Sequence, residues 1–358
     1  MSLRILIMAG GTGGHVFPAL AVAETLRSQG VNVMWLGTRA GLEADIVPRA
    51  GIDISFISIS GLRGKSWLSW LLAPSKLTVA FMQSLMLLIR LRPNAVLGMG
   101  GFVAGPGGFS AWLLDKPLVI HEQNAIAGLT NRLLAPLASK VLEGFPGSLH
   151  TRHALHTGNP VRAEITAVTE PEQRLTGRSG ALRLLVLGGS LGAQIFNEVV
   201  PKSLHAFAPD ARPEVWHQTG ARNIDAARQC YQEAGVTARL VPFIGDMAEA
   251  YGWADLVLCR AGALTVAELA CAGVAAILVP YPHAVDDHQT HNARYLADAG
   301  AAVLVPQPGL TPAYLTDLLK DFSQARNRLL AMAQAARNCA QPEAAARVAA
   351  LCREAAHG

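Results

Sequence analysis

The chain has few lysines, few aromatic side chains and no closely spaced pair of cysteines. Lysine supplies only six of the 30 basic residues, aromatic residues make up 6%, and the arginines are scattered. Because no basic run carries interleaved aromatic side chains, the sequence gives no support for a nucleic-acid partner. The five cysteines are odd in number and lack C-x-x-C spacing, which indicates neither a disulfide framework nor a common zinc site and favours a reducing, cytoplasmic compartment.

Several cofactor signatures are also missing. The glycine run Gly10–Gly14 is not followed by the lysine of a P-loop, and the expected second strand ends at Thr38 without the acid that holds a ribose in NAD enzymes. The polar loop 280–292 holds three histidines and two aspartates, but their spacing matches no common zinc pattern. We therefore expect neither a metal ion nor another cofactor. The short apolar run at the start has no cleavage site, so we expect a first strand rather than a signal peptide.

The most informative feature that is present is an internal repeat. Leu3–Gly10 closely resembles Leu182–Gly189, half the length of the 358-residue chain later, and each apolar run opens into a glycine turn. Runs of this kind are typical of buried parallel strands, and the turn that follows suits a phosphate. We therefore predict an α/β protein with two Rossmann-like halves. The predicted strands cover residues 3–9, 31–36, 94–98, 117–120, 182–187, 213–217, 254–259 and 275–279.

Length and hydropathy agree with two domains, because 358 residues exceed the size at which one core stops growing and the mean hydropathy is +0.28. Turn residues gather at 158–162 and again at 171–180. We expect an N-terminal domain over residues 1–160 and a C-terminal domain over 161–339. A final helix at about 340–358 is expected to pack back on the first domain.

One apolar segment, residues 67–89, has a composition close to that of a membrane span and is flanked by arginine and lysine. Pro74 and Lys76 interrupt it, so we expect two helical pieces rather than one spanning helix. One piece either lies in the membrane interface or packs on the sheet, and the sequence leaves both alternatives open.

Polar residues follow the strands of the first half at the edge where ligands bind in this fold class. The glycine loops at 10–14 and 98–108 together favour a cradle for phosphate or pyrophosphate over a turn that only packs a helix. His15 is either a general base or a capping group. The cluster 121–124, His-Glu-Gln-Asn, suits sugar hydroxyls and proton transfer, and its alternative is an ordinary polar loop.

The second half offers a matching set for a nucleotide sugar. The turn 188–190 and the helix start near 260–265 suit a diphosphate, and Glu268 suits the two hydroxyls of a ribose, although a solvated glutamate is the alternative for that residue alone. Asp287, Gln289 and Asn292 are candidates for reading the sugar.

These blocks together resemble the MurG family of bacterial cell-wall glycosyltransferases. The resemblance runs nearly end to end, through GGTGGHVFPALAVA, GLRGK, GMGGFVAGPGG, HEQNAIAGLTNR, GNPVR, GGSLGA, RAGALTVAELACAG and PHAVDDHQTHNA. It implies the GT-B glycosyltransferase fold, with two Rossmann-like domains facing a central cleft. For the donor UDP-GlcNAc, it implies binding by Thr12, Gly13, Gly14, Asn124, Arg162, Ser190, Ile244, Ala263, Leu264, Thr265, Val266, Ala267, Glu268 and Gln289. For the acceptor pyrophosphate, it implies binding by Gly10, Gly11, Gly100, Gly101 and Asn131.

The implied reaction is inverting transfer of GlcNAc to the C4 hydroxyl of undecaprenyl-pyrophosphoryl-MurNAc-pentapeptide, with His15 as the first choice of general base and Glu122, oriented by His121, as the second. The implied place is the cytoplasmic face of the bacterial inner membrane, where a peripheral enzyme meets an anionic surface and other cell-wall synthesis proteins. Two alternatives remain open: a UDP-GlcNAc 2-epimerase of the same fold, and a non-catalytic membrane-surface module that binds nucleotide sugars.

Overall fold

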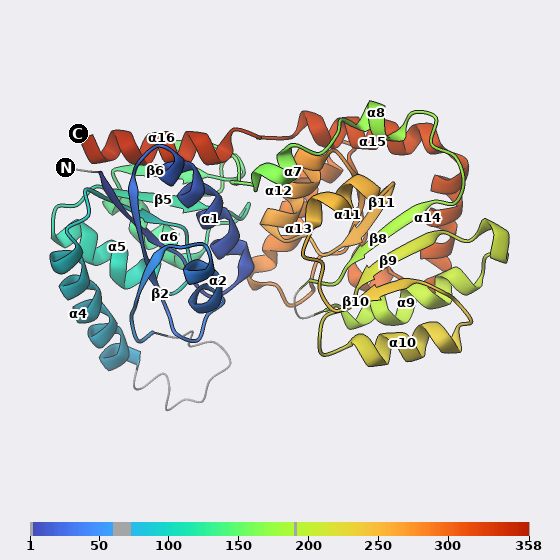
Figure 1. Cartoon of the computed structure of the whole chain (residues 1–358), viewed down its shortest axis with the longest axis horizontal. Helices are drawn as coiled ribbons and strands as arrows, with labels where there is room; N and C mark the ends of the chain where they lie inside the picture. Colours follow the sequence, from blue (N-terminus) through green and yellow to red (C-terminus); the bar gives the residue numbers. More distant parts are fainter. Residues whose placement is uncertain (1–2, 60–72, 190–191, 358) are drawn as a thin grey trace. The chain divides into compact units, whose positions relative to one another are not determined.

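The computed structural model describes residues 3–59, 73–189 and 192–357. The chain divides into two compact units, of which unit 1 comprises residues 1–162 and 341–358 and unit 2 comprises residues 163–340. Each unit is built on its own parallel sheet (Figure 1). The two sheets have matching topologies, so the internal repeat of the sequence corresponds to a repeat of structure.

The sheet of unit 1 has seven parallel strands in the order β3-β2-β1-β4-β5-β6-β7, whose first six positions follow the Rossmann order. Its central strands are almost wholly apolar because helices cover both faces. The strands are β1 (Arg4–Met8), β2 (Asn32–Gly37), β3 (Asp53–Phe56), β4 (Ala95–Gly98), β5 (Leu118–Glu122), β6 (Lys140–Glu143) and β7 (Ala154–His156).

Two groups of helices cover this sheet. On one face, α1 (Gly13–Ser28), α2 (Glu43–Arg49) and α16 (Ala344–His357) enclose a core that includes Trp35 and Val348. On the other face, α4 (Ala73–Leu91), α5 (Ala104–Leu113) and α6 (Leu129–Leu134), with the short turn η1 (Ala135–Leu137), enclose a second core. Figure 1 shows α16, in red, running along α1, so the last helix of the chain belongs to unit 1.

The sheet of unit 2 has six parallel strands in the order β10-β9-β8-β11-β12-β13, again the Rossmann order. Its strands are β8 (Arg183–Leu187), β9 (Glu214–Gln218), β10 (Arg239–Val241), β11 (Leu256–Cys259), β12 (Ala275–Leu278) and β13 (Ala302–Leu304). Its helical elements are α7 (Ala163–Thr166), α8 (Pro171–Leu175), α9 (Gln194–His205), η2 (Pro209–Ala211), α10 (Ile224–Glu233), α11 (Met247–Trp253), α12 (Ala263–Ala272), η3 (Val285–Asp287), α13 (His288–Ala297), η4 (Gln307–Gly309), α14 (Pro312–Gln324) and α15 (Arg326–Asn338).

The structure places a single helix over most of the apolar segment. Residues 67–72 lie outside the described residues, and α4 runs without interruption from Ala73 to Leu91. Pro74 and Lys76 lie in the first turn, where a proline is tolerated because its missing N–H would have no intrahelical acceptor. Among the described residues, no helix is long and apolar enough to cross a membrane.

Candidate functional site

The two glycine loops of unit 1 meet at the carboxyl edge of the sheet. The backbone N–H of Met99 donates to the carbonyl of Met8, at 2.8 Å, and brings the ends of β1 and β4 together. A Cβ built on Gly101, whose φ is +80°, would collide with the carbonyl oxygen of Gly10. Only glycine allows this approach, so the loops at 10–14 and 98–108 form one backbone-lined surface.

A buried carboxylate that the sequence analysis did not single out lies beneath the first loop. Glu43, at the start of α2, is 0% exposed and accepts the backbone N–H of Gly11 at 2.9 Å. Its other oxygen accepts both the backbone N–H and the hydroxyl of Thr38, each at 2.8 Å. Glu43 therefore ties the glycine turn after β1 to the end of β2.

His15 belongs to a chain of hydrogen-bonded side chains. It lies half-buried in the first turn of α1, and its Nδ1 is 3.1 Å from Oε1 of Gln123. Gln123 follows β5 and contacts His121, whose Nε2 is 2.9 Å from the carbonyl oxygen of Gly158. Burial lowers the pKa of His121 to about 4, so His121 is neutral at physiological pH.

Both carboxylate oxygens of Glu122 accept hydrogen bonds from neighbouring groups. It is 2% exposed, and its Oε1 accepts the backbone N–H of Asn124 at 2.9 Å. Its Oε2 accepts from Asn131 Nδ2 and from the backbone N–H of Gly128. Asn131 is itself buried, and its Oδ1 has no hydrogen-bond partner among the described residues. The structure thus brings four predicted residues, His121, Glu122, Asn124 and Asn131, into one cluster.

In unit 2, the start of α12 has no side-chain cap. Gly262 caps this helix and has no side chain to accept from the first-turn N–H groups of Ala263, Leu264 and Thr265. One turn on, Glu268 is largely buried, and its Oε2 accepts a hydrogen bond from the hydroxyl of Tyr251, at 3.0 Å. Tyr251, which comes from α11 and is fully buried, was not predicted from the sequence.

The remaining predicted residues have varied environments. Ile244 is buried with its N–H 3.4 Å from Gln218 Oε1, and Gln289 Oε1 accepts the N–H of Tyr281 at 2.9 Å. Asn292 is fully buried and donates to the carbonyl of Ala261, so its amide supports the loop before α12.

In unit 1, the guanidinium of Arg162 lies 5.4 Å from the ring of Phe17. Ser190 lies outside the described residues.

In the described part of the chain, no group of three or more histidine, cysteine or acidic side chains is placed to hold a metal ion.

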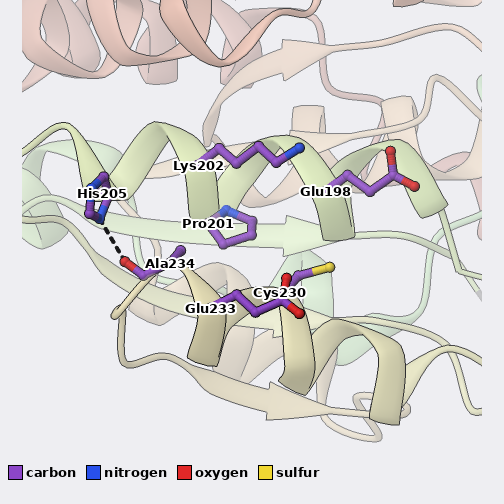
Figure 2. Close-up of a pocket in the computed structure, with 7 residues that line it drawn as sticks. All are labelled: Glu198, Pro201, Lys202, His205, Cys230, Glu233 and Ala234. Carbon is purple, nitrogen blue, oxygen red and sulfur yellow. Dashed lines mark hydrogen bonds between the residues drawn. The ribbon is translucent and has the colours of Figure 1, made fainter.

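A cavity of about 300 Å³ lies between α9 and α10. It is lined by the residues drawn in Figure 2, and the ring of His205 is hydrogen-bonded to the carbonyl of Ala234. It lies by the C-terminal ends of both helices, so it is remote from the carboxyl edge of the sheet, where ligands bind in this fold class.

Comparison with known proteins identifies the family. The model of the glycosyltransferase family 28 N-terminal domain matches residues 5–143, and that of the family 28 C-terminal domain matches residues 183–348. The chain is 59% identical, over 99% of its length and 98% of the relative, to the UDP-N-acetylglucosamine--N-acetylmuramyl-(pentapeptide) pyrophosphoryl-undecaprenol N-acetylglucosamine transferase of Marinobacter nauticus. It is 57% identical to the Nitrosococcus oceani protein of the same name over the full length of both.

Solved structures show the same relationship. The crystal structure of Acinetobacter baumannii MurG superimposes with a TM-score of 0.83 at 42% identity, covering 98% of this chain and 99% of that one. A UDP-GlcNAc 2-epimerase from Neisseria meningitidis, at 11% identity and a TM-score of 0.68 over 98% of this chain and 100% of that one, shares the fold alone. Two parallel α/β domains with these relatives have the GT-B fold, and the chain belongs to glycosyltransferase family 28 and, within it, to the MurG family.

Proposed function

We propose that the protein transfers N-acetylglucosamine from UDP-GlcNAc to the C4 hydroxyl of undecaprenyl-pyrophosphoryl-MurNAc-pentapeptide, with inversion at the anomeric carbon. The names of the full-length relatives support the substrates. The observation that most supports the proposed proton transfer is the contact between His15 and Gln123 beside the paired glycine loops. The acceptor oxygen forms the new bond to the anomeric carbon, the bond from that carbon to UDP breaks, and the hydroxyl proton passes to the general base.

The donor is assigned to unit 2. The first-turn N–H groups of α12 and the positive end of its dipole stabilise the diphosphate, whose charge grows as UDP leaves, without a metal ion in the step. Glu268, held by Tyr251, accepts hydroxyls of the ribose, and the backbone of Ile244 binds the uracil. Gln289 reads the sugar, while the contacts predicted for Arg162 and Asn124, which belong to unit 1, and for Ser190, which lies outside the described residues, stay predictions from the sequence.

The acceptor pyrophosphate is assigned to the glycine loops of unit 1. Gly11 donates its N–H to Glu43, so that group shapes the turn and is not offered to a ligand. The N–H groups at the start of α1, at Gly13 and Gly14, are better placed to meet an anion, because α1 begins at Gly13 and its cap residue makes no side-chain hydrogen bond. Gly100 and Gly101 complete the surface.

His15 is the proposed general base, in preference to Glu122 and His121. His15 is half-buried, whereas the other two side chains are almost fully buried and their hydrogen-bonding atoms are engaged. A general base must reach the hydroxyl proton within hydrogen-bond distance. The contacts of Glu122 and His121 support a role in holding the loop 123–131.

We also propose that the α4–α5–α6 face contacts an anionic membrane, which would supply the lipid-linked acceptor. It exposes ten large apolar side chains beside the exposed cations Lys76, Arg90, Arg92 and Arg132. The rings of Phe81 and Phe109 lie 5.5 Å apart and join α4 to α5. The exposed apolar residues are Leu77, Val79, Met82, Met86, Ile89, Phe109, Trp112, Leu113, Leu129 and Leu133.

This composition is typical of an interfacial surface. Co-sedimentation with vesicles containing anionic lipid tests it, and the double change Met86→Asp with Ile89→Asp should abolish most binding. A matched double change on unit 2, Gln229→Asp with Gln232→Asp, adds the same negative charge at exposed positions and should have little effect. Equal binding by both double variants would contradict the assignment.

The reaction is tested by measuring UDP release from UDP-GlcNAc with and without the lipid-linked acceptor, in the presence of EDTA. We expect release only with acceptor. Release without acceptor would instead indicate the epimerase or a hydrolase, and no release would indicate a binding module. His15→Ala should lower kcat by about 100-fold to 10,000-fold, the usual contribution of a general base, whereas His205→Ala on α9 should not. Near-normal turnover of His15→Ala would transfer the role to Glu122.

A further inference from the structure

The amide of Gln123 is held in one orientation by the groups around it. Its side chain is 1% exposed, and its Nε2 donates to the carbonyl oxygens of Met99, at 3.0 Å, and of His121, at 3.2 Å. The same nitrogen lies 3.3 Å from Nδ1 of His121. A flipped amide would turn its own oxygen toward both carbonyls, where no hydrogen bond can form.

The ring of His121 completes this arrangement. Its Nε2 faces the carbonyl oxygen of Gly158, at 2.9 Å, and a carbonyl only accepts, so Nε2 carries the proton. Because His121 is neutral, its Nδ1 then has a lone pair, which can accept from Nε2 of Gln123. Three acceptors therefore surround the nitrogen of the Gln123 amide, and the amide oxygen points the other way.

That oxygen determines which nitrogen of His15 is protonated. Oε1 of Gln123 lies 3.1 Å from Nδ1 of His15 and can only accept, so Nδ1 carries the proton when the ring is neutral. The other ring nitrogen, Nε2, then has its lone pair available. Gly100 leaves room for this contact, because a Cβ there would lie 2.7 Å from Nδ1 of His15.

We propose that Gln123 is a positioning residue that selects the Nδ1–H tautomer of His15 and so keeps Nε2 ready to take the proton of the acceptor hydroxyl. The inference rests on the proposed function for the use of that lone pair, but the tautomer itself is a property of the protein alone. A wrong tautomer is costly in related proton transfers, because the group that should accept a proton already carries one.

The tautomer is tested directly by nitrogen-15 NMR of the histidine rings in the full-length protein, with His15 assigned by comparison with His15→Ala. We expect a neutral ring with the proton on Nδ1 in the wild type. In Gln123→Met, which has a side chain of similar length but no acceptor, the Nε2–H form should gain population. A wild-type ring protonated on Nε2 would overturn the proposal, even in a protein that transfers GlcNAc normally.

Kinetics supply the second test. Gln123→Met should lower kcat by about tenfold to 100-fold, less than the full contribution of a general base, with the KM for UDP-GlcNAc unchanged. In Gln123→Glu, a protonated carboxyl can donate its O–H to the acceptors that surround Nε2 in the wild type while its other oxygen accepts from His15, so this variant should recover both the Nδ1–H tautomer and much of kcat. Gln232→Met, at an exposed position of α10, controls for the substitution. Equal losses of kcat in the Met and Glu variants, with the tautomer unmoved, would reduce Gln123 to a packing role.

The two proposals fail separately. If the wild-type protein transfers no GlcNAc, the proposed function fails while the NMR result still decides the tautomer. If Gln123→Met does not fold, the wild-type spectrum and Gln123→Glu still decide the role of the amide.

Discussion

Replacing Glu43 by glutamine should loosen the first glycine turn without changing the shape of any side chain in it. In the native protein, one carboxylate oxygen accepts the N–H of Gly11 and the other accepts two hydrogen bonds from Thr38. A glutamine can satisfy only one of these two sides with its oxygen. Its NH2 group must then face either Gly11 or Thr38, where the neighbouring backbone group is also a donor.

The expected cost follows from those contacts. If the amide oxygen keeps the two bonds from Thr38, the turn loses its bond from Gly11 to a charged acceptor. A hydrogen bond to a charged group contributes about 1.5–3 kcal/mol. Gly11 is itself exposed, so water can bind its N–H and no further penalty for an unsatisfied donor is added. We expect local destabilisation of about 1.5–3 kcal/mol.

Amide hydrogen exchange measures this effect at the turn itself. A loss of about 1.5–3 kcal/mol corresponds to protection of the Gly11 amide that is about tenfold to 100-fold lower, because each 1.4 kcal/mol is a factor of ten in the opening equilibrium. Asp45→Asn is the matched control, since it removes an exposed acid from the same helix. Unchanged protection of Gly11 in Glu43→Gln, or equal loss in both variants, would refute the reasoning.

Three other perturbations test the remaining contacts. Tyr251→Phe removes the hydroxyl that donates to Glu268. Titration calorimetry should show UDP binding about threefold to tenfold weaker, the effect of one hydrogen bond of about 0.5–1.5 kcal/mol. Unchanged affinity would show that Tyr251 does not support the ribose site. Asp255→Asn should destabilise unit 2 by about 3–5 kcal/mol in urea unfolding, because this buried carboxylate pairs with two arginines; a shift below 1 kcal/mol would be too small for a desolvated pair. Burial lowers the pKa of His121 from 6.5 to about 4, so the unfolded chain binds a proton at a higher pH than the folded protein does. The stability that neutral His121 contributes is complete above pH 6.5 and should fall by roughly 3 kcal/mol as the pH drops toward 4. His121→Gln should flatten this dependence of the stability of unit 1 on pH.

The central strands were predictable because their signal is local. All eight predicted strands exist, within about two residues at their ends, since long runs of valine, isoleucine and leucine are needed wherever a parallel strand is covered on both faces. Of the two helical pieces predicted within residues 67–89, the second matches α4, which begins at Ala73 with Pro74 in its first turn, and the first lies outside the described residues. The five strands that were missed have only three or four residues each: β3, β6, β7, β10 and β13.

The grouping of side chains in the candidate site was predictable where residues follow a strand end, and not where a partner comes from another element. His15 and the cluster 121–124 follow glycine turns or strands, which the sequence displays. Glu43 and Tyr251 lie on helices, and on sequence alone an isolated glutamate on a helix looks solvated. A signal for Glu43 did exist, because Gly10, Gly37 and Gly41 all leave the space that its carboxylate fills. Only the fold shows that these three glycines face one side chain.

The assignment of α16 to unit 1 bears on how the protein folds during its synthesis. Val348, Ala349 and Cys352 are fully buried in the core that α1 also lines, yet all residues of unit 2 precede them in the chain. One face of the core of unit 1 therefore stays uncovered on the ribosome until unit 2 and then α16 have been synthesised. The nascent form of unit 1 is the stage at which this protein most needs protection from aggregation.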